Sequence, residues 1–415
     1  MEKNMLSGPG AYLIGEEEKN EILDVLESGW LSRYGEKGNP RFKGKVPTFE
    51  KNFENYLGAK HSILVNGGTN ALLICLEALG IGPGDEVIVP GFTFVASISS
   101  ILYARAIPVI AEINESLTID PDDIEKKITK RTKAIIPVHM IGNPCNMDKI
   151  MDIAKKHNLF VIEDTCQALG ASYKNKKLGT YGHINAFSLN WYKTITTGDG
   201  GIVTTDDDSL YERAFGIHDQ GHKPSRLGQE VGKRSIIGLN FRVNELTGAV
   251  AIAQLRKLDG IIKTLRNNKK KLKDLIELKK GVKFLPLNDK GEIATWLTFL
   301  FDNKDNAKDF ATLLDGPTMY NTGWHNYNNM EHILSKKMPT KYGCPFDCNE
   351  YGKVVEYKQH MLPQTDNVLS RSVSISIGVV DSGMSALMDL SVLSTDEDIK
   401  RVANKINGAL GKVLT

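Results

Sequence analysis

Two ionisable side chains in the middle of the chain stand just after segments that read as strands. Residues 159–162 form an apolar run of strand length that ends on Glu163 and Asp164. A second apolar patch, residues 186–189, leads into a turn that carries Lys193, followed by threonines and glycines. In open α/β sheets, ligands bind in the crevice outside the carboxyl ends of the strands. We therefore expect Asp164 and Lys193 to face the same crevice.

An aspartate and a lysine in such a crevice meet the requirements of pyridoxal 5'-phosphate. The lysine amine forms a Schiff base with the aldehyde of the cofactor, and the aspartate pairs with its pyridinium nitrogen. A carboxylate at hydrogen-bonding distance raises the pKa of that nitrogen and keeps it protonated. Burial or a nearby cation would lower the pKa of the lysine, which lets it act as nucleophile and proton carrier. Two simpler interpretations stay open here: Lys193 is a surface lysine in a polar turn, and Asp164 is a helix cap.

A candidate phosphate site lies earlier in the chain. Residues 62–65 read as a strand, residues 66–69 (NGGT) follow it, and a helix opens at residue 70. A helix N-terminus offers free N–H groups and a positive dipole end to a phosphate. Gly68 lets the backbone come close and Thr69 adds a hydroxyl. No Gly-Lys-Ser/Thr follows, so this is not a Walker loop.

The elements that position these residues alternate between strand and helix through the first half of the chain. The predicted strands are apolar throughout, which is typical of a mostly parallel sheet covered by helices on both faces. We predict helices over 16–29, 48–57, 96–104, 121–127 and 147–157, and strands over 62–65, 86–89, 108–111 and 134–139.

The pattern changes in the last third of the chain. A helix is predicted over 246–258 and a long amphipathic helix from about 261 to 280, and strand-like pieces (VKFLPL, TWLTFLF, SVSISI) then alternate with helices over 304–315 and 395–409. A chain of 415 residues is long for one core. We therefore predict two domains: residues 1–262, an N-terminal segment with a large α/β domain, and residues 263–415, a linking helix with a small α+β domain.

Composition excludes several classes of protein. The net charge of +2 and the absence of a long apolar run favour neither nucleic acid nor a membrane as partner, and no signal peptide is evident. Five cysteines form an odd set, so we expect reduced thiols in a cytoplasmic protein. Cys344 and Cys348 have no second ligand pair nearby, and residues 218–222 (HDQGH) resemble a zinc-protease motif only superficially, because Gly221 disfavours the required helix. We predict no metal.

Two motifs carry a resemblance to a known family. Residues 161–170 (VIEDTCQALG) and 187–201 (FSLNWYKTITTGDGG) resemble the DegT/DnrJ/StrS sugar aminotransferases, and the likeness extends over nearly the whole chain. The resemblance implies the fold of the aspartate-aminotransferase type, in which a large domain with a mostly parallel sheet binds pyridoxal 5'-phosphate and a smaller C-terminal α+β domain follows. It also implies a homodimer with a shared active site.

The resemblance assigns roles to individual residues. Lys193 would form the Schiff base and Asp164 would pair with the ring nitrogen, as catalytic residues. Phe94 would stack on the ring, Gln167 would lie near it, and Ser188 would bind the phosphate. In trans, Asn240 and Arg242 would reach the cofactor phosphate of the partner subunit. The full predicted cofactor-binding set is Gly68, Thr69, Phe94, Asp164, Gln167, Ser188, Lys193, Asn240 and Arg242.

Some segments are similar to one branch of this family. Residues 319–333, Arg371 and the Arg33-Tyr34 pair resemble the transaminases of lipopolysaccharide assembly that make 8-amino-3,8-dideoxy-manno-octulosonate. An acidic sugar and a glutamate donor both carry carboxylates, which arginine pairs with through two hydrogen bonds. A surface or core role stays open for each of the predicted substrate residues, which are Arg33, Tyr34, Trp324, His325 and Arg371.

The function implied by the resemblance is amino transfer. An amino acid, L-glutamate, would supply the amino group, and a keto- or aldehydo-sugar would accept it. The sugar would be 8-oxo-3-deoxy-octulosonate or a nucleotide-linked keto-sugar. Two alternatives stay open: a pyridoxal-phosphate-dependent sugar dehydratase or lyase, in which relatives carry His in place of the lysine, and a non-catalytic regulator that keeps the fold. Lys193 in place of His and the lack of an iron–sulfur cysteine cluster argue against the first, and a regulator would not need the lysine.

Overall fold

A central twisted sheet organises the chain in the computed structural model, which describes residues 7–36, 38–224, 232–347 and 355–414. Seven strands of these described residues form the sheet, in the order β1-β9-β8-β5-β4-β2-β3. All of its neighbouring pairs are parallel except those made by β9, which is antiparallel to β1 and to β8. The strands are β1 (His61–Val65), β2 (Glu86–Pro90), β3 (Ile107–Ala111), β4 (Thr132–Ile135), β5 (Phe160–Asp164), β8 (Ile184–Ser188) and β9 (Gly201–Thr205).

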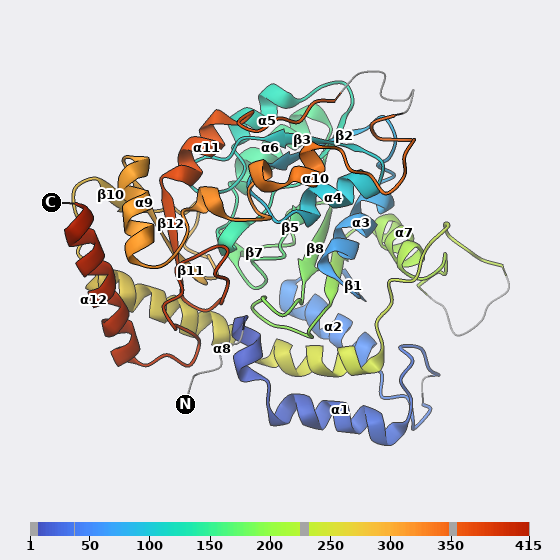
Figure 1. Ribbon diagram of the computed structural model, residues 1–415. Coiled ribbons are helices and arrows are strands. Elements are labelled where there is room, and N and C mark those ends of the chain that lie inside the picture. Colours follow the sequence, from blue (N-terminus) through green and yellow to red (C-terminus); the bar gives the residue numbers. More distant parts are fainter. Residues whose placement is uncertain (1–6, 37, 225–231, 348–354, 415) are drawn as a thin grey trace.

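Helices bury both faces of this sheet, as Figure 1 shows. On β1, Ile63 and Val65 belong to one apolar cluster and Leu64, between them, belongs to another, so the strand is apolar on both sides. This explains the continuous apolar runs in the sequence. One face is covered by α3 (Gly68–Ala78), α4 (Ala96–Tyr103) and α7 (Asp208–His218), and the other by α2 (Lys45–Leu57), α5 (Pro121–Lys127), α6 (Met147–His157) and α8 (Glu245–Leu275).

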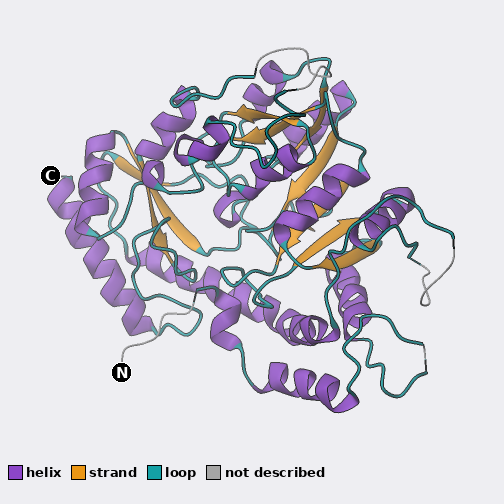
Figure 2. Ribbon diagram, turned by 45° about the vertical axis from the view of Figure 1, so that its right-hand side comes forward, coloured by secondary structure: helices purple, strands orange, loops and turns teal. Residues whose placement is uncertain are grey.

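A second, antiparallel sheet lies in the C-terminal part of the chain, with helices on its outer side (Figure 2). Its order is β10-β11-β12, formed by β10 (Val282–Phe284), β11 (Trp296–Phe301) and β12 (Ser372–Ser376). The helices α9 (Lys304–Leu313) and α12 (Asp396–Val413) share the apolar core with it, and α11 (Pro363–Ser370) leads into β12. The predicted fold class, a mostly parallel sheet with a smaller α+β part, is confirmed.

One long helix replaces the two that the sequence predicted around residue 260. The helix α8 has 31 residues, passes through Gly260, and packs against α1 (Glu16–Ser28), α2 and α12. Glycine is tolerated there because burial of Ile252, Leu258 and Ile261 outweighs its helix propensity. The predicted domain boundary after residue 262 falls inside α8, and it stays a prediction.

Two expectations about cysteines and membranes can be set against the structure. Cys75, Cys145 and Cys166 are free thiols, whereas Cys344 is disulfide-bonded, so the expectation of reduced thiols throughout is wrong for Cys344. Cys348 lies outside the described residues. Among the helices that the structure describes, none is both long and apolar enough to cross a membrane. The cytoplasmic location stays a prediction.

Candidate active site

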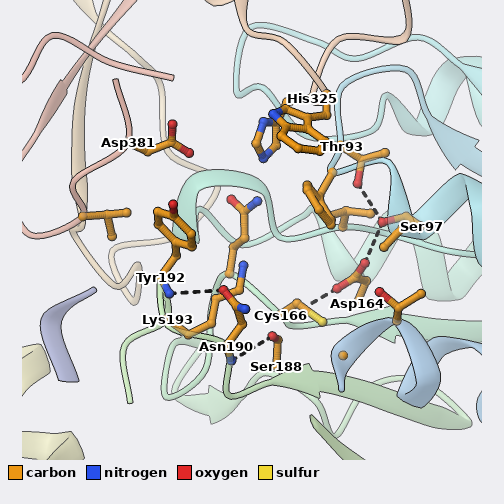
Figure 3. Close-up of a pocket in the computed structure, with 18 of the residues that line it drawn as sticks. Thr93, Ser97, Asp164, Cys166, Ser188, Asn190, Tyr192, Lys193, His325 and Asp381 are labelled. Carbon is orange, nitrogen blue, oxygen red and sulfur yellow. Dashed lines mark hydrogen bonds between the residues drawn. The ribbon is translucent and has the colours of Figure 1, made fainter. Parts of the chain in front are cut away.

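The ends of several strands meet around one cavity with a volume of about 470 Å³. The carboxyl ends of β1, β2, β5 and β8 lie at one edge of the sheet, and the antiparallel β9 begins at the same edge. Figure 3 shows the side chains that these ends and the C-terminal part of the chain direct into the cavity. The volume lies within the range typical of small-molecule sites.

The cavity gathers most of the residues that the sequence singled out, and excludes others. Nine of them line it: Gly68, Thr69, Phe94, Asp164, Gln167, Ser188, Lys193, Trp324 and His325. Five do not: Arg33, Tyr34, Asn240, Arg242 and Arg371. The roles of all of them stay predictions, but the geometry separates the two groups.

Asp164 is held in place by a short chain of hydrogen bonds. The Ser97 hydroxyl, at the start of α4, donates to Asp164 Oδ2 over 2.8 Å, and it also pairs with the Thr93 hydroxyl over 2.8 Å. The Cys166 N–H donates to Asp164 Oδ1 over 3.1 Å. The carboxylate is only 3% exposed. These contacts fix its direction and leave acceptor capacity for a protonated ring nitrogen.

Lys193 lies in a loop, residues 189–200, that is closed at its base. The Leu189 N–H donates to the Gly200 carbonyl and the Thr197 N–H donates to the Leu189 carbonyl, each over 2.9 to 3.0 Å. Burial lowers the pKa of the Lys193 ammonium, and the nearby Cys166, Asp164 and Asp381 oppose that shift. A lowered pKa makes the amine a better nucleophile near neutral pH.

The first turn of α3 passes very close to the end of β8. A Cβ on Gly68 would lie 2.8 Å from Ser188 Cβ, which is nearer than side chains approach, and 3.1 Å from Ser188 Oγ, which is a tight contact. Glycine therefore lets the N–H groups of this turn, the Thr69 hydroxyl and the Ser188 hydroxyl surround one space. Such a group of donors at a helix N-terminus suits a phosphate.

Aromatic side chains from two distant segments form one wall. The Thr93 N–H donates to the His325 carbonyl over 2.9 Å and the Val95 N–H donates to the Trp324 carbonyl over 3.0 Å, so residues 324–326 run alongside residues 92–95. The ring of Phe94 lies 5.4 Å from that of His325. Burial, and then the charge of Lys193, lower the pKa of His325 to about 3, so this wall is neutral.

Arg33 and Tyr34 have their partners at the edge of the sheet beside β1 rather than in the cavity. The Arg33 guanidinium is buried and donates to Glu50 Oε1 over 2.9 Å and to His218 Nε2 over 3.0 Å. His218 in turn donates from Nδ1 to a backbone carbonyl, so the first histidine of the HDQGH motif has both ring nitrogens occupied. The Tyr34 hydroxyl donates to Asp219 over 2.6 Å. This geometry gives Arg33 a structural role and does not support its predicted contact with substrate.

Arg371 and Arg242 also find partners outside the cavity. Arg371 donates to the Phe301 carbonyl over 2.8 Å and pairs with Glu115 over 3.4 Å. Arg242 pairs with Asp219 at the end of α7, next to the edge strand β1. Its neighbour Asn240 is exposed. A single chain therefore brings neither Asn240 nor Arg242 into its own cavity, which is compatible with their predicted action in trans.

Several side chains that line the cavity were not predicted from the sequence. Ser97 orients Asp164, and Asn190 donates to Asp199 Oδ1 over 3.0 Å within the Lys193 loop. Ser97 could have been found as the hydroxyl one turn after Phe94. Asp381 comes from a loop of the C-terminal part of the chain, and nothing in its local sequence indicates that this loop reaches the cavity.

Comparison with known proteins agrees with this geometry. A sequence model of the DegT/DnrJ/EryC1/StrS aminotransferase family matches residues 13–380. The chain belongs to that family. Members of the family are pyridoxal-phosphate enzymes, which confirms the cofactor class predicted from Asp164 and Lys193.

Individual relatives refine this assignment. A GDP-perosamine synthase from Caulobacter vibrioides is 42% identical over 243 residues, 58% of this chain and 62% of the synthase. Another from Escherichia coli O157:H7 is 40% identical over 271 residues, 64% of this chain and 71% of the synthase. The match to the first thus spans less than two thirds of its length. The aminotransferase from Psychrobacter cryohalolentis superposes with a TM-score of 0.77 at 26% identity, over 96% of this chain and 98% of that one.

The family is therefore established, but the predicted branch is not. These two relatives are named for GDP-perosamine, and they give the octulosonate transaminase branch no specific support. The structure points the same way, because Arg33 and Arg371, which suggested that branch, are paired outside the cavity.

The residues of the cavity fit pyridoxal 5'-phosphate. Asp164 would hold the ring nitrogen, the turn at Gly68 with the Thr69 and Ser188 hydroxyls would hold the phosphate, and Lys193 would hold the aldehyde carbon. Phe94 stands beside the same space. A Cβ at residue 68 would fill the narrow space between α3 and Ser188, so a substitution of Gly68 tests directly whether the cofactor phosphate binds there.

Gly68→Ala should weaken cofactor binding by at least about tenfold, because the new methyl group pushes α3 away from Ser188. Binding can be measured by equilibrium dialysis of pyridoxal 5'-phosphate against the cofactor-free chain. Gly260→Ala is the matched control, since a Cβ there meets nothing within 4 Å and adds helix propensity. Equal affinity of the Gly68→Ala variant and the wild type would contradict a phosphate site at this turn.

Proposed function

We propose that this chain is a pyridoxal-phosphate-dependent aminotransferase that moves an amino group from L-glutamate to a keto-sugar. The observation that carries the proposal is the meeting of Lys193, Asp164 and the turn at Gly68 in one cavity. Family membership supports amino transfer, and the relatives named for an amino sugar support a sugar as the acceptor.

Each of the main side chains in the cavity has a separate role in the proposed reaction. When bound, the cofactor supplies an electron sink that stabilises negative charge at the carbon carrying the amine. Asp164, fixed by Ser97, holds the proton on the ring nitrogen. Lys193 takes a proton from the substrate carbon and returns one, as general base and then general acid. His325 and Phe94 exclude water on one side of the cavity.

A nucleotide-linked keto-sugar is the acceptor that we propose. The similarity to GDP-perosamine synthases supports it. The free acid 8-oxo-3-deoxy-octulosonate is the second candidate, suggested by the likeness of residues 319–333 to that branch. The second candidate needs a cation for its carboxylate, and Arg33 and Arg371 are paired with Glu50 and Glu115.

Two other classes are less well supported. The sugar dehydratases that resemble this chain carry His in place of the lysine, so Lys193 argues against that class. A non-catalytic regulator would not need Lys193 to share a cavity with Asp164 and Ser188. The lowered pKa of Lys193 suits a reacting amine rather than a surface lysine.

A homodimer with shared sites is part of the proposal. Asn240 and Arg242 lie next to the edge of the sheet and outside the cavity of their own chain. The neighbouring side chain of Ile237 is 95% exposed and that of Leu239 is 58% exposed. Exposed apolar residues beside candidate phosphate ligands are typical of an interface.

L-Glutamate should shift the visible absorption band of the holoenzyme into the near ultraviolet in single-turnover mixing. Lys193→Ala should lower the rate of this shift by about 10³-fold or more, because the proton carrier is lost. Lys51→Ala, which removes an exposed lysine of α2, is the control and should react at the wild-type rate. A Lys193→Ala protein that reacts normally would disprove the assignment.

GDP-perosamine should act as an amine donor in the reverse direction, at a rate at least about a hundredfold above that of 8-amino-3,8-dideoxy-octulosonate. The same spectral shift reports both reactions, with 2-oxoglutarate added to complete turnover. Reaction of the octulosonate amine alone would establish the second candidate. If neither amine reacts while L-glutamate does, the acceptor is a different sugar and this part of the proposal is wrong.

Inactive variants should complement each other if sites are shared. The double variant Asn240→Ala/Arg242→Ala and the variant Lys193→Ala should each be nearly inactive as homodimers. After mixing and subunit exchange, half of the dimers carry one intact site of two, so about a quarter of wild-type activity should return. Activity no higher than that of the separate variants, with exchange verified by mass spectrometry, would contradict the action of Asn240 and Arg242 in trans.

A further inference from the structure

A carboxylate from the C-terminal part of the chain faces Lys193 across the cavity. Residues 379–384 follow β12, and Val379, Asp381 and Met384 line the cavity there. Figure 3 shows the Asp381 carboxylate directed into the cavity, on the side opposite Asp164. The match to the family model covers residues 13–380 and therefore ends just before Asp381.

One short segment holds the Asp381 loop and the Lys193 loop together. We call residues 7–13 the N-terminal strap; it includes the 3-10 helix η1 (Pro9–Leu13). The Val380 N–H donates to the Ser7 carbonyl over 2.7 Å. One residue later, a Cβ on Gly8 would lie 2.6 Å from the carbonyl oxygens of Trp191 and Lys193. The strap therefore fixes the two loops relative to each other, although they are far apart in sequence.

The cavity is lined by more acidic than basic side chains. Lys193 is the cationic side chain among the lining residues that the structure describes, and three aspartates share the cavity with it. Asp164 receives hydrogen bonds from Ser97 and Cys166, and Asp199 receives one from Asn190. Asp381 receives the Gly383 N–H over 3.0 Å, and no side chain in the described part of the chain donates to it.

We propose that Asp381 is a positioning residue that holds the proton on the Lys193 nitrogen between proton transfers. Asp164 is reserved for the ring nitrogen, so its charge is neutralised when the cofactor is bound. Asp381 then remains as the carboxylate that attracts the Lys193 cation. The attraction directs the side chain and sets the pH at which its proton is lost.

The surroundings of both groups agree with this role. Burial raises the pKa of Asp381, and Lys193 lowers it. Burial likewise lowers the pKa of Lys193, and Cys166, Asp164 and Asp381 raise it. Among the residues that the structure describes, four other titratable side chains line the cavity, which are Cys166, Tyr192, Asp199 and His325. Burial raises the pKa of the Cys166 thiol and keeps it neutral, and His325 is neutral near pH 7. Asp199 is hydrogen-bonded to Asn190. Removal of the Asp381 charge should therefore lower the pKa of the Lys193 nitrogen.

The first test uses the holoenzyme without substrate. The visible band of the bound cofactor changes with pH as the joined Lys193 nitrogen loses its proton. For Asp381→Asn, the midpoint of this change should move to lower pH by about one unit. Asp381→Glu should restore it to within a few tenths of a unit. Asp389→Asn removes an exposed charge from the segment that follows and should leave it unchanged.

The second test needs neither cofactor nor sugar, so it separates this proposal from the proposed function. The cofactor-free full chain is briefly acetylated with acetic anhydride at a series of pH values, and the modification of Lys193 relative to Lys51 is read by mass spectrometry. Asp381→Asn should shift the Lys193 profile to lower pH by about one unit, which is about tenfold more acetylation at pH values below the midpoint.

Asp381→Ser serves if the amide variant does not fold, because its hydroxyl can still accept the Gly383 N–H. Profiles of Asp381→Asn or Asp381→Ser that coincide with the wild type in the acetylation test would overturn the proposal. A shift equally large in Asp389→Asn would also overturn it, because the effect would then not come from the cavity.

Discussion

The site depends on the attraction between the buried ammonium group of Lys193 and the carboxylates around it. Burial disfavours the charged forms of Lys193 and of Asp381. Each charge is tolerated because the others offset the cost of its desolvation. The acids come from separate parts of the fold, Asp164 from β5 and Asp381 from the loop after β12. The large sheet alone cannot supply this arrangement, so the site requires the C-terminal part of the chain to be packed in place.

The large sheet shapes the site because its strands lie very close to the backbone of the first turn of α3. Because β9 is antiparallel, it begins at the edge where β1 and β8 end. A Cβ on Gly201, the first residue of β9, would lie 2.4 Å from the Gly67 carbonyl oxygen. Together with the contact of Gly68 on Ser188, this packs the first turn of α3 tightly against two strands. The donors that suit a phosphate are thus set by main-chain packing, which is rigid, rather than by mobile side chains.

The sequence predicted the site residues whose positions follow from local secondary structure, and it did not reveal ion pairs that form through tertiary packing. Asp164 ends an apolar run and Gly68 stands between a strand and a helix, so strand-end geometry alone places both at the ligand edge. Arg33 and Arg371 were assigned to the substrate from a family resemblance, and the structure places both outside the cavity, because each is paired with an acid that the sequence does not reveal. Their partners, Glu50 and Glu115, are brought to them by tertiary packing.

Nonlocal packing also explains what was not foreseen in the fold and at the site. Gly260 reads as a break between two helices, yet apolar residues on both sides of it hold α8 straight through. Asp381 is 188 positions after Lys193 in the chain, and the N-terminal strap contacts both of their loops. No periodicity or motif in the sequence predicts a contact among the N-terminal strap, the Lys193 loop and the Asp381 loop. The position of Asp381 therefore had to come from the structure.

The charge of the cavity bears on how a dicarboxylate donor could bind. With Asp164, Asp199 and Asp381 in the wall, and Lys193 as the cation among the described lining residues, a single chain presents a net negative surface to glutamate. Two carboxylates would enter such a space at a high electrostatic cost unless further cations closed over it.

Arg242 is paired with Asp219 at the sheet edge, outside its own cavity, beside the exposed Ile237 and Leu239. In the proposed dimer, apolar contact at these side chains would carry that cation toward the neighbouring cavity. Donor binding would then depend on dimerisation, because the partner subunit would supply the further cation that each cavity needs.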